Sequence, residues 1–178
     1  GNNPFKDSDI NHVNGTGTTS SFTLANGGSK LDIGAGYYPM AQTGNLVWLD
    51  ENYNGIQDSN EERIAGVVVQ AYDANTNEMV GEAITESDGT YMIDYLDKRE
   101  VYLKFTPPAG YHATFTGAGN DFIDSDVDHS YGLNTTRMFS LQPGDNIESI
   151  DMGILNGVLP VTWVDIKATN SGDHHTID

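Results

Sequence analysis

The chain has 178 residues, of which 26 are Asp or Glu and 8 are Lys or Arg, so its formal net charge is −18. This charge excludes nucleic acid and anionic lipid surfaces as partners, because both repel an acidic protein. Cysteine is absent, so no disulfide braces the fold, and no apolar run is long enough for direct membrane insertion. We therefore expect another means of stabilising the fold.

Residues 1–40 repeat residues 118–157 without a gap, at the constant offset of 117 that separates Asp7 from Asp124. Other aligned pairs are Asp9 and Asp126, Asn11 and Asp128, Phe22 and Phe139, Leu24 and Leu141, Ile33 and Ile150, and Gly36 and Gly153. A single offset over a whole stretch indicates repeated domains. We predict that residues 1–40 are the C-terminal half of a preceding repeat, residues 41–157 a complete repeat, and residues 158–178 a linker or the start of a following domain.

Residues 50–61 match a calcium-binding loop. Such a loop needs oxygen ligands at positions 1, 3, 5, 7, 9 and 12 and a glycine at position 6 for its sharp turn. Gly55 stands at the sixth position. The predicted ligands are the side chains of Asp50, Asn52, Asn54, Asp58 and Glu61 and the carbonyl of Ile56. The pattern predicts a Ca²⁺ site, with a solvated acidic turn as the alternative. Strand-like flanks, rather than helices, place the loop on a β scaffold.

The remaining pattern predicts strands throughout. β-branched and alternating apolar residues indicate strands over 45–49, 64–72, 79–85, 90–95, 101–105, 111–116, 137–141 and 148–155. Ser87-Asp88-Gly89 predicts a hairpin between the third and fourth of these strands, with Asp88 serving the turn itself. No window shows sustained helical periodicity. Short strands at regular spacing predict an all-β fold, a β-sandwich with Greek-key connections.

A second acidic cluster follows the predicted sixth strand. Asp124, Asp126 and Asp128 recur at every second residue, with Asp121 just upstream. In an extended strand this spacing puts three carboxylates on one face, where they repel one another unless a cation binds. The equivalent oxygen donors of the first copy are Asp7, Asp9 and Asn11. We predict a second calcium site here, with a solvated acidic turn as the alternative.

These blocks together resemble the B-type repeats of serine-aspartate (Sdr) surface proteins. The resemblance runs from Gly44 through the loop, and then in order through the blocks that begin at Gly66, Thr85, Val101, Asp124 and Ile150. It implies a calcium-binding, prealbumin-like β-sandwich that occurs in tandem in bacterial cell-surface proteins. It also implies an extracellular location and a structural or adhesive role rather than an enzymatic one. No nucleophile elbow, metalloprotease helix or phosphate loop contradicts this.

The segment 158–178 contains Leu-Pro-Val-Thr-Trp at 159–163. It is similar to the joints that precede the sorting region of proteins exported by the type IX system. Such a joint implies a secretion or cell-surface complex as a partner. The segment also alternates like a strand from Val161 to Ile166 and is alternatively a strand donated to a neighbouring subunit.

Three functional interpretations follow. The first is a calcium-stabilised repeat of a secreted surface protein, acting as a stalk or spacer whose partners are neighbouring repeats. The second is a subunit of an extracellular filament, because an incomplete half-domain leaves unpaired strand edges that another copy of the chain can complete. The third is a ligand-binding adhesive module.

Overall fold

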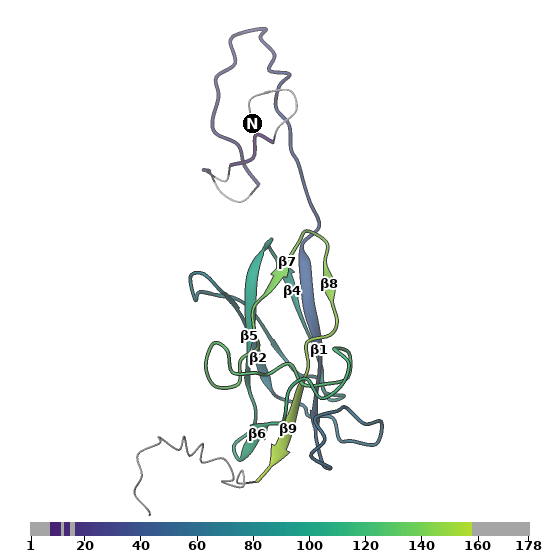
Figure 1. Cartoon of the computed structure of the whole chain (residues 1–178). Coiled ribbons are helices and arrows are strands. Elements are labelled where there is room, and N and C mark those ends of the chain that lie inside the picture. Colours follow the sequence, from purple (N-terminus) through teal and green to yellow (C-terminus); the bar gives the residue numbers. More distant parts are fainter. Residues whose placement is uncertain (1–7, 12, 15–16, 158–178) are drawn as a thin grey trace, which may run out of the picture.

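Nine strands form two sheets in the computed structural model, which describes residues 8–11, 13–14 and 17–157 (Figure 1). One sheet has the order β4-β1-β9-β6 with β8 also beside β1, and the other has the order β3-β2-β5-β7. The strands are β1 (Ala41–Leu49), β2 (Val68–Asp73), β3 (Met79–Ile84), β4 (Thr90–Leu96), β5 (Arg99–Thr106), β6 (Tyr111–Ala113), β7 (Phe139–Leu141), β8 (Asn146–Ile147) and β9 (Met152–Asn156). The predicted all-β sandwich is confirmed.

Strand β1 organises the first sheet because both of its edges are paired. It runs antiparallel to β4 and parallel to β8 and β9. Gly44 lies where β1 and β4 approach most closely, since a Cβ there would stand 2.1 Å from the carbonyl oxygen of Tyr91. The predicted strand begins at Asn45, whereas β1 begins at Ala41, so the sequence pattern missed the half that contains this glycine.

The core lies between the two sheets and is aliphatic and aromatic. Val47 on β1 is fully buried in this core. Its neighbour Trp48 is also fully buried but is not part of the same cluster, and Gly153 on β9 leaves room for its indole ring. From the opposite sheet, Val69 and Leu103 are also fully buried. Tyr91 and Phe105 meet edge to face across the sandwich, with ring centroids 5.7 Å apart. Burial on this scale is the main favourable contribution to folding in a chain without disulfides.

The turn at Ser87-Asp88-Gly89 joins the two sheets instead of closing a hairpin. The turn itself is confirmed: the Gly89 N–H donates to the carbonyl of Glu86, and Asp88 accepts from the Thr90 N–H and hydroxyl. These bonds hold the pKa of Asp88 below its usual value. However, β3 pairs with β2 and β4 pairs with β1. The hairpin prediction is therefore wrong, because sequence spacing shows a reversal but not which sheet each arm joins.

Residues 8–40 extend away from the sandwich at the end where β1 begins (Figure 1). The predictions for residues 158–178, including the type IX joint and the donated strand, lie outside the described residues, as does Asp7. Among the residues that are described, the structure has no helix of membrane-spanning length and hydropathy.

Candidate calcium site

Asp50 directly follows β1 and is the first residue of the loop. Its hydrogen bonds to three other parts of the chain hold it in place. Its N–H donates to the carbonyl of Ile154 at the end of β9 (2.9 Å). Its carboxylate accepts from the N–H groups of Asn54 (3.1 Å) and Gly55 (2.9 Å) and from the hydroxyl of Thr114 (2.5 Å). The side chain is 1% exposed. This first predicted ligand is thus a buried carboxylate on a rigid strand end.

Glu61 closes the other end of the loop. One carboxylate oxygen accepts from the N–H of Glu51 (3.0 Å), and the other accepts from the N–H of Asp58 (2.9 Å). The Asp58 carboxylate in turn accepts from the side-chain amides of Asn52 (2.7 Å) and Asn54 (3.0 Å). Hydrogen bonds thus connect Asp58 to Glu61 and to both asparagines of the loop, and the calcium ligand set stays a prediction.

Gly55 has the backbone conformation for which the calcium-loop template requires a glycine at position 6. Its φ of +72° lies in the left-handed region, where side chains other than glycine are strained. A Cβ there would also stand 2.9 Å from the carbonyl oxygen of Phe115 and 3.0 Å from the side chain of Ala118. The loop is thus packed against residues 115–118.

The second acidic cluster lies beside the loop. Ile56, a predicted ligand through its carbonyl, forms an antiparallel bridge with Asp124. The N–H of Gln57 donates to the carbonyl of Ile123 (2.7 Å). Asp124 is 4% exposed, and its Oδ1 atom has no hydrogen-bond partner within the described structure. The two acidic segments, far apart in sequence, therefore form one region of the surface.

The second cluster surrounds a hollow of about 290 Å³. Its lining includes all four predicted acidic residues of the cluster, together with Arg137: these are Asp121, Asp124, Asp126 and Asp128. Asp128 also stabilises a turn, since it accepts from the N–H of Ser130 (2.9 Å). The four carboxylates thus line one hollow with a guanidinium, but no three acidic side chains of the described residues converge to hold a metal ion, and the second calcium site stays a prediction.

Asp151 is the acidic residue that the sequence analysis missed. It is fully buried, and its carboxylate accepts from the N–H of Leu46 (3.1 Å) and the side-chain amide of Asn45 (3.0 Å). Its N–H donates to the Asp126 carboxylate (2.7 Å). Burial raises the pKa of Asp126 to about 7 and that of Asp151 to about 8. The sequence feature that could have identified Asp151 is an acid within the otherwise apolar segment Ile150–Ile154.

The donor set fits calcium. Carboxylate, amide and carbonyl oxygens are the ligands that this hard cation prefers. No ion pair of the described residues reaches the buried carboxylates of Asp50, Glu61 or Asp124. Hydrogen bonds alone compensate Asp50 and Glu61, whereas Oδ1 of Asp124 has no partner, which is costly for a buried charge. Within the described ranges, no three Asp, Glu or His side chains converge closely enough to hold a metal ion by themselves. A calcium ion here therefore also needs the loop's amide and carbonyl oxygens.

In the first copy, Asp9 and Asn11 bond to the local backbone. Asp9 accepts from the N–H of Gly34 (2.8 Å), and Asn11 accepts from the N–H of Val13 (3.2 Å). A metal site there stays a prediction.

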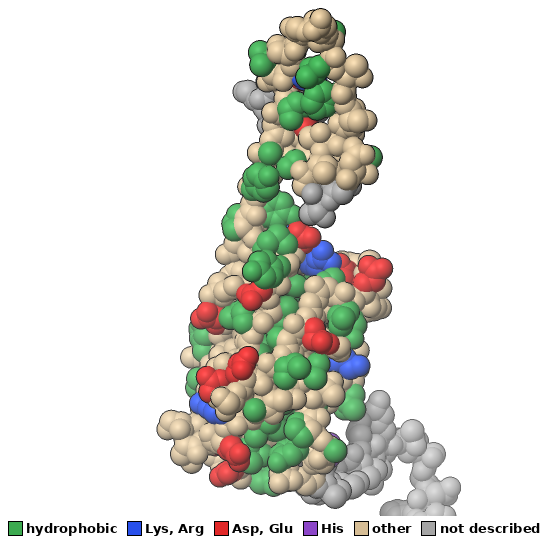
Figure 2. Space-filling view, turned by 180° about the vertical axis from the view of Figure 1, so that it is seen from behind, with side chains coloured by type: hydrophobic (Ala, Val, Ile, Leu, Met, Phe, Trp, Pro, Cys, Tyr) green, Lys and Arg blue, Asp and Glu red, His purple; other side chains and the backbone are tan. Residues whose placement is uncertain are grey.

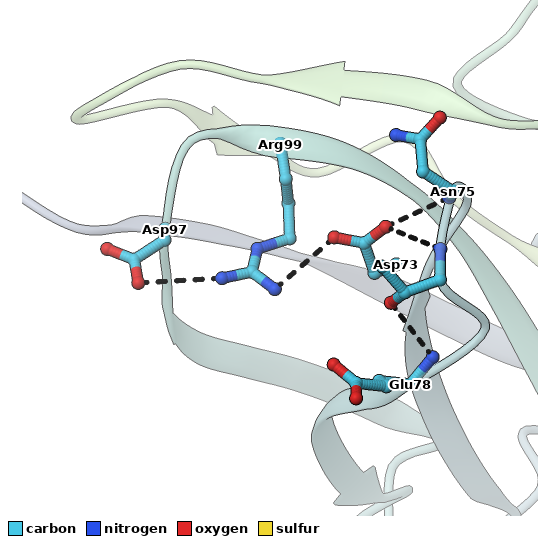
Figure 3. Close-up of polar contacts among 6 residues, drawn as sticks. Asp73, Asn75, Glu78, Asp97 and Arg99 are labelled. Carbon is cyan, nitrogen blue, oxygen red and sulfur yellow. Dashed lines mark hydrogen bonds and ion pairs between the residues drawn. The ribbon is translucent and has the colours of Figure 1, made fainter.

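At the opposite end of the sandwich, the segment that precedes Ala41 leads into β1. The hydroxyl of Tyr38 donates to the Asp97 carboxylate (2.8 Å), which raises the pKa of Tyr38. Figure 3 shows the Arg99 guanidinium between Asp97 and Asp73, at 3.5 Å from each carboxylate. Asp73 also accepts from the N–H of Asn75 (2.9 Å), the main cause of its lowered pKa. Polar contacts thus link residues 8–40 to the start of β5.

The fold is an all-β sandwich with an acidic loop at one end and the entering segment at the other. The model of the SdrD B-like domain matches residues 41–154. Serine-aspartate repeat-containing protein D of Staphylococcus aureus (strain Newman) is 36% identical over 151 residues, covering 84% of this chain and 11% of that protein. Serine-aspartate repeat-containing protein F of Staphylococcus epidermidis is 37% identical over 110 residues, covering 61% of this chain and 6% of that protein.

The chain belongs to the SdrD B-like domain family. Membership confirms the predicted family, the cell-surface location and a non-enzymatic role. The chain spans about a tenth or less of the length of these two relatives. Among solved structures, the minor pilin GBS52 of Streptococcus agalactiae is 14% identical with a TM-score of 0.47, covering 69% of this chain and 47% of the pilin.

Proposed function

We propose that this chain is a calcium-stabilised structural repeat of a secreted bacterial surface protein, in which it acts as a rigid stalk or spacer between neighbouring repeats. Calcium acts here as a structural ion that replaces the absent disulfides. The observation that carries the proposal is the meeting of the loop 50–61 with Asp124. Three buried carboxylates without ion pairs lie in or beside a loop with the spacing of a calcium ligand set.

The ion acts on this fold by joining parts that are distant in sequence. The loop follows β1, whereas Asp124 precedes β7. A cation shared by the loop and Asp124 compensates their charge and ties the first strand to the later half of the domain. This closes the end of the sandwich at which β9 ends (Figure 1), so that the chain leaves the domain from a fixed point.

Calcium titration of the full chain by calorimetry tests the site. Asp124→Asn is expected to weaken calcium binding at least about tenfold, because it removes one carboxylate charge while preserving side-chain shape. The matched control is Asp94→Asn, which removes an exposed carboxylate on β4. Equal calcium affinity in Asp124→Asn and the unaltered chain would contradict a role for Asp124. The absence of calcium binding to the unaltered chain would refute the proposal.

The stalk role predicts a fixed angle between residues 8–40 and the sandwich. Asp97→Ala removes the acceptor of the Tyr38 hydroxyl and one contact of Arg99. We expect the motion of residues 30–38 on the nanosecond scale to increase, measured by ¹⁵N relaxation, while the melting temperature changes little because Tyr38 is exposed and the Asp97 side chain is half-exposed. Asp94→Ala is the control. Unchanged relaxation in Asp97→Ala would show that this contact does not fix the angle.

A further inference from the structure

Three tyrosine rings form a stack on the outer face of the second sheet. Tyr72 on β2 and Tyr102 on β5 are direct cross-strand partners, and their nearly parallel rings have centroids 5.4 Å apart. Tyr131, in the loop before β7, stacks on Tyr102 with a centroid distance of 4.3 Å. Val101 and Leu103 belong to the core, so alternation along β5 places Tyr102 on the outer face. These rings therefore form an aromatic surface outside the core.

Hydrogen bonds hold the loop that carries Tyr131. The Tyr131 N–H donates to Thr135 Oγ1 (2.9 Å), and the His129 N–H donates to the carbonyl of Thr135 (2.9 Å). The Asn134 N–H donates to His129 Nδ1 (2.9 Å). His129 and Asn134 have φ angles of +64° and +59°, a region that few residues other than glycine adopt. The Tyr131 ring, which is 38% exposed, is thus positioned before any ligand binds.

A groove of about 690 Å³ adjoins the stack. Its lining includes all three stacked tyrosines and the turn formed by residues 107–110. The basic residues in this lining are Lys104 and His112. The volume lies within the range of sites that hold small ligands, and such sites combine aromatic walls with a few polar groups.

The groove has no acidic side chain, although the chain is strongly acidic. None of the residues that line it is Asp or Glu, whereas acidic side chains are spread over the face seen in Figure 2. A hollow beside β3 and β4, in contrast, includes Glu82, Glu86 and Glu148. Lys104 forms no ion pair within the described part of the chain. The groove therefore offers one cation without a counter-ion to a negatively charged ligand.

Residues 134–136 already occupy the edge of β5 beside the groove. The Phe105 N–H donates to the carbonyl of Asn134 (2.9 Å), and the Thr136 N–H donates to the carbonyl of Leu103 (2.9 Å). An antiparallel bridge joins residues 104 and 135 between these bonds. An extended peptide therefore cannot bind here by adding a strand, and recognition depends on the side chains that line the groove.

These features fit a sugar ligand with one carboxylate. Sugar rings have C–H faces that pack on aromatic rings, and their hydroxyl groups bond to polar side chains such as Thr106 and Asn134, which also line the groove. One lysine matches one carboxylate. A polyanion would extend beyond the groove and meet the acidic surface around it, which repels it.

We infer that the groove binds an oligosaccharide that carries a single carboxylate. The Lys104 ammonium pairs with the carboxylate, and a sugar ring packs on Tyr131. This binding function is additional to the structural role. It does not rest on the calcium proposal, because neither the loop 50–61 nor Asp124 contributes to the lining of the groove.

Sialyllactose and lactose are suitable probes, because sialyllactose is lactose with one further sugar that carries the single carboxylate. Each is titrated into the full chain in calcium and followed by ¹⁵N NMR. Sialyllactose is expected to shift the amides of residues 106–112 and 129–135, and lactose is expected to bind about fivefold more weakly. Absence of shifts with either sugar, or shifts confined to residues 50–61, would overturn the inference.

Lys104→Gln tests the charge. Its affinity for sialyllactose is expected to fall about fivefold, while its affinity for lactose stays unchanged. The matched control is Lys98→Gln, which makes the same change at an exposed lysine outside the groove and is expected to keep both affinities. An equal loss in the two variants would attribute the preference to net charge and overturn the role of Lys104.

Tyr131→Leu tests the aromatic contact, because it removes the ring and keeps an apolar side chain. Both sugars are expected to bind at least about fivefold more weakly, with the amide shifts of β2 and β5 showing that the sheet is intact. Tyr37→Leu, at a tyrosine that is 85% exposed outside the groove, is the control. Undiminished affinity in Tyr131→Leu would contradict the sugar contact. Shifts of residues 106–112 and 129–135 by a proline-rich peptide, with none by the sugars, would identify a peptide site instead.

Discussion

Removal of calcium is expected to lower the melting temperature of the full chain by about 10 °C. Calcium at about 100 to 1,000 times its dissociation constant contributes roughly 3–4 kcal/mol to the free energy of unfolding. For a domain of this size each kcal/mol corresponds to about 3–4 °C. The measurement is calorimetric unfolding in calcium and in excess chelator. The double variant Asp50→Ala, Glu61→Ala is expected to melt at one temperature in both conditions.

The controls separate a bound ion from general screening of charge. Acidic side chains are spread over the sandwich (Figure 2), and any salt reduces their mutual repulsion. Magnesium at the same ionic strength is expected not to restore the melting temperature, because it demands a tighter octahedral shell and dehydrates reluctantly. Since the double variant is at risk of misfolding, Asp50→Asn provides a milder change with the same expected loss of calcium response. Equal stabilisation by magnesium would contradict a specific site.

The sequence predicts local features of the site well and its distant contacts poorly. The spacing within residues 50–61 predicts a sharp turn at Gly55, whose φ of +72° lies in the left-handed region, whereas the calcium ligands of the loop stay a prediction. In contrast, the bridge between Ile56 and Asp124 depends on how two loops meet after folding, and no short-range pattern encodes it. Asp151 was missed because its role depends on tertiary structure, which buries it just before β9 and places its N–H against the Asp126 carboxylate.

The fold shows the same division between local and distant information. Alternating apolar residues locate the strands, because side chains on a strand point to opposite faces in turn. They do not determine pairing, so the reversal at Ser87-Asp88-Gly89 was predicted while the crossing between sheets was not. The internal repeat is the exception. It compares one part of the chain with another, and the reciprocal hydrogen bonds of Asp9 with Gly34 recur between the aligned residues Asp126 and Asp151.

Gly44→Ala is expected to destabilise the domain by at least about 3 kcal/mol, through forced separation of β1 from β4. The added Cβ would stand 2.1 Å from the carbonyl oxygen of Tyr91 and 2.9 Å from the Cα of Met92. Both atoms belong to backbone that is paired with β1, so no side-chain rotation relieves the clash. Denaturant unfolding of both chains in the same buffer with excess chelator measures the loss without contribution from ion release.

Gly119→Ala is the matched control for this substitution. A Cβ at Gly119 meets only side-chain atoms of Ile56 and Ile123 at 3.6 Å or more, which is ordinary van der Waals contact. Its free energy of unfolding is therefore expected to change by less than about 1 kcal/mol. A comparable loss in both variants would attribute the effect to glycine replacement in general. A loss confined to Gly44→Ala shows that the close approach of β1 and β4 determines the stability of the domain.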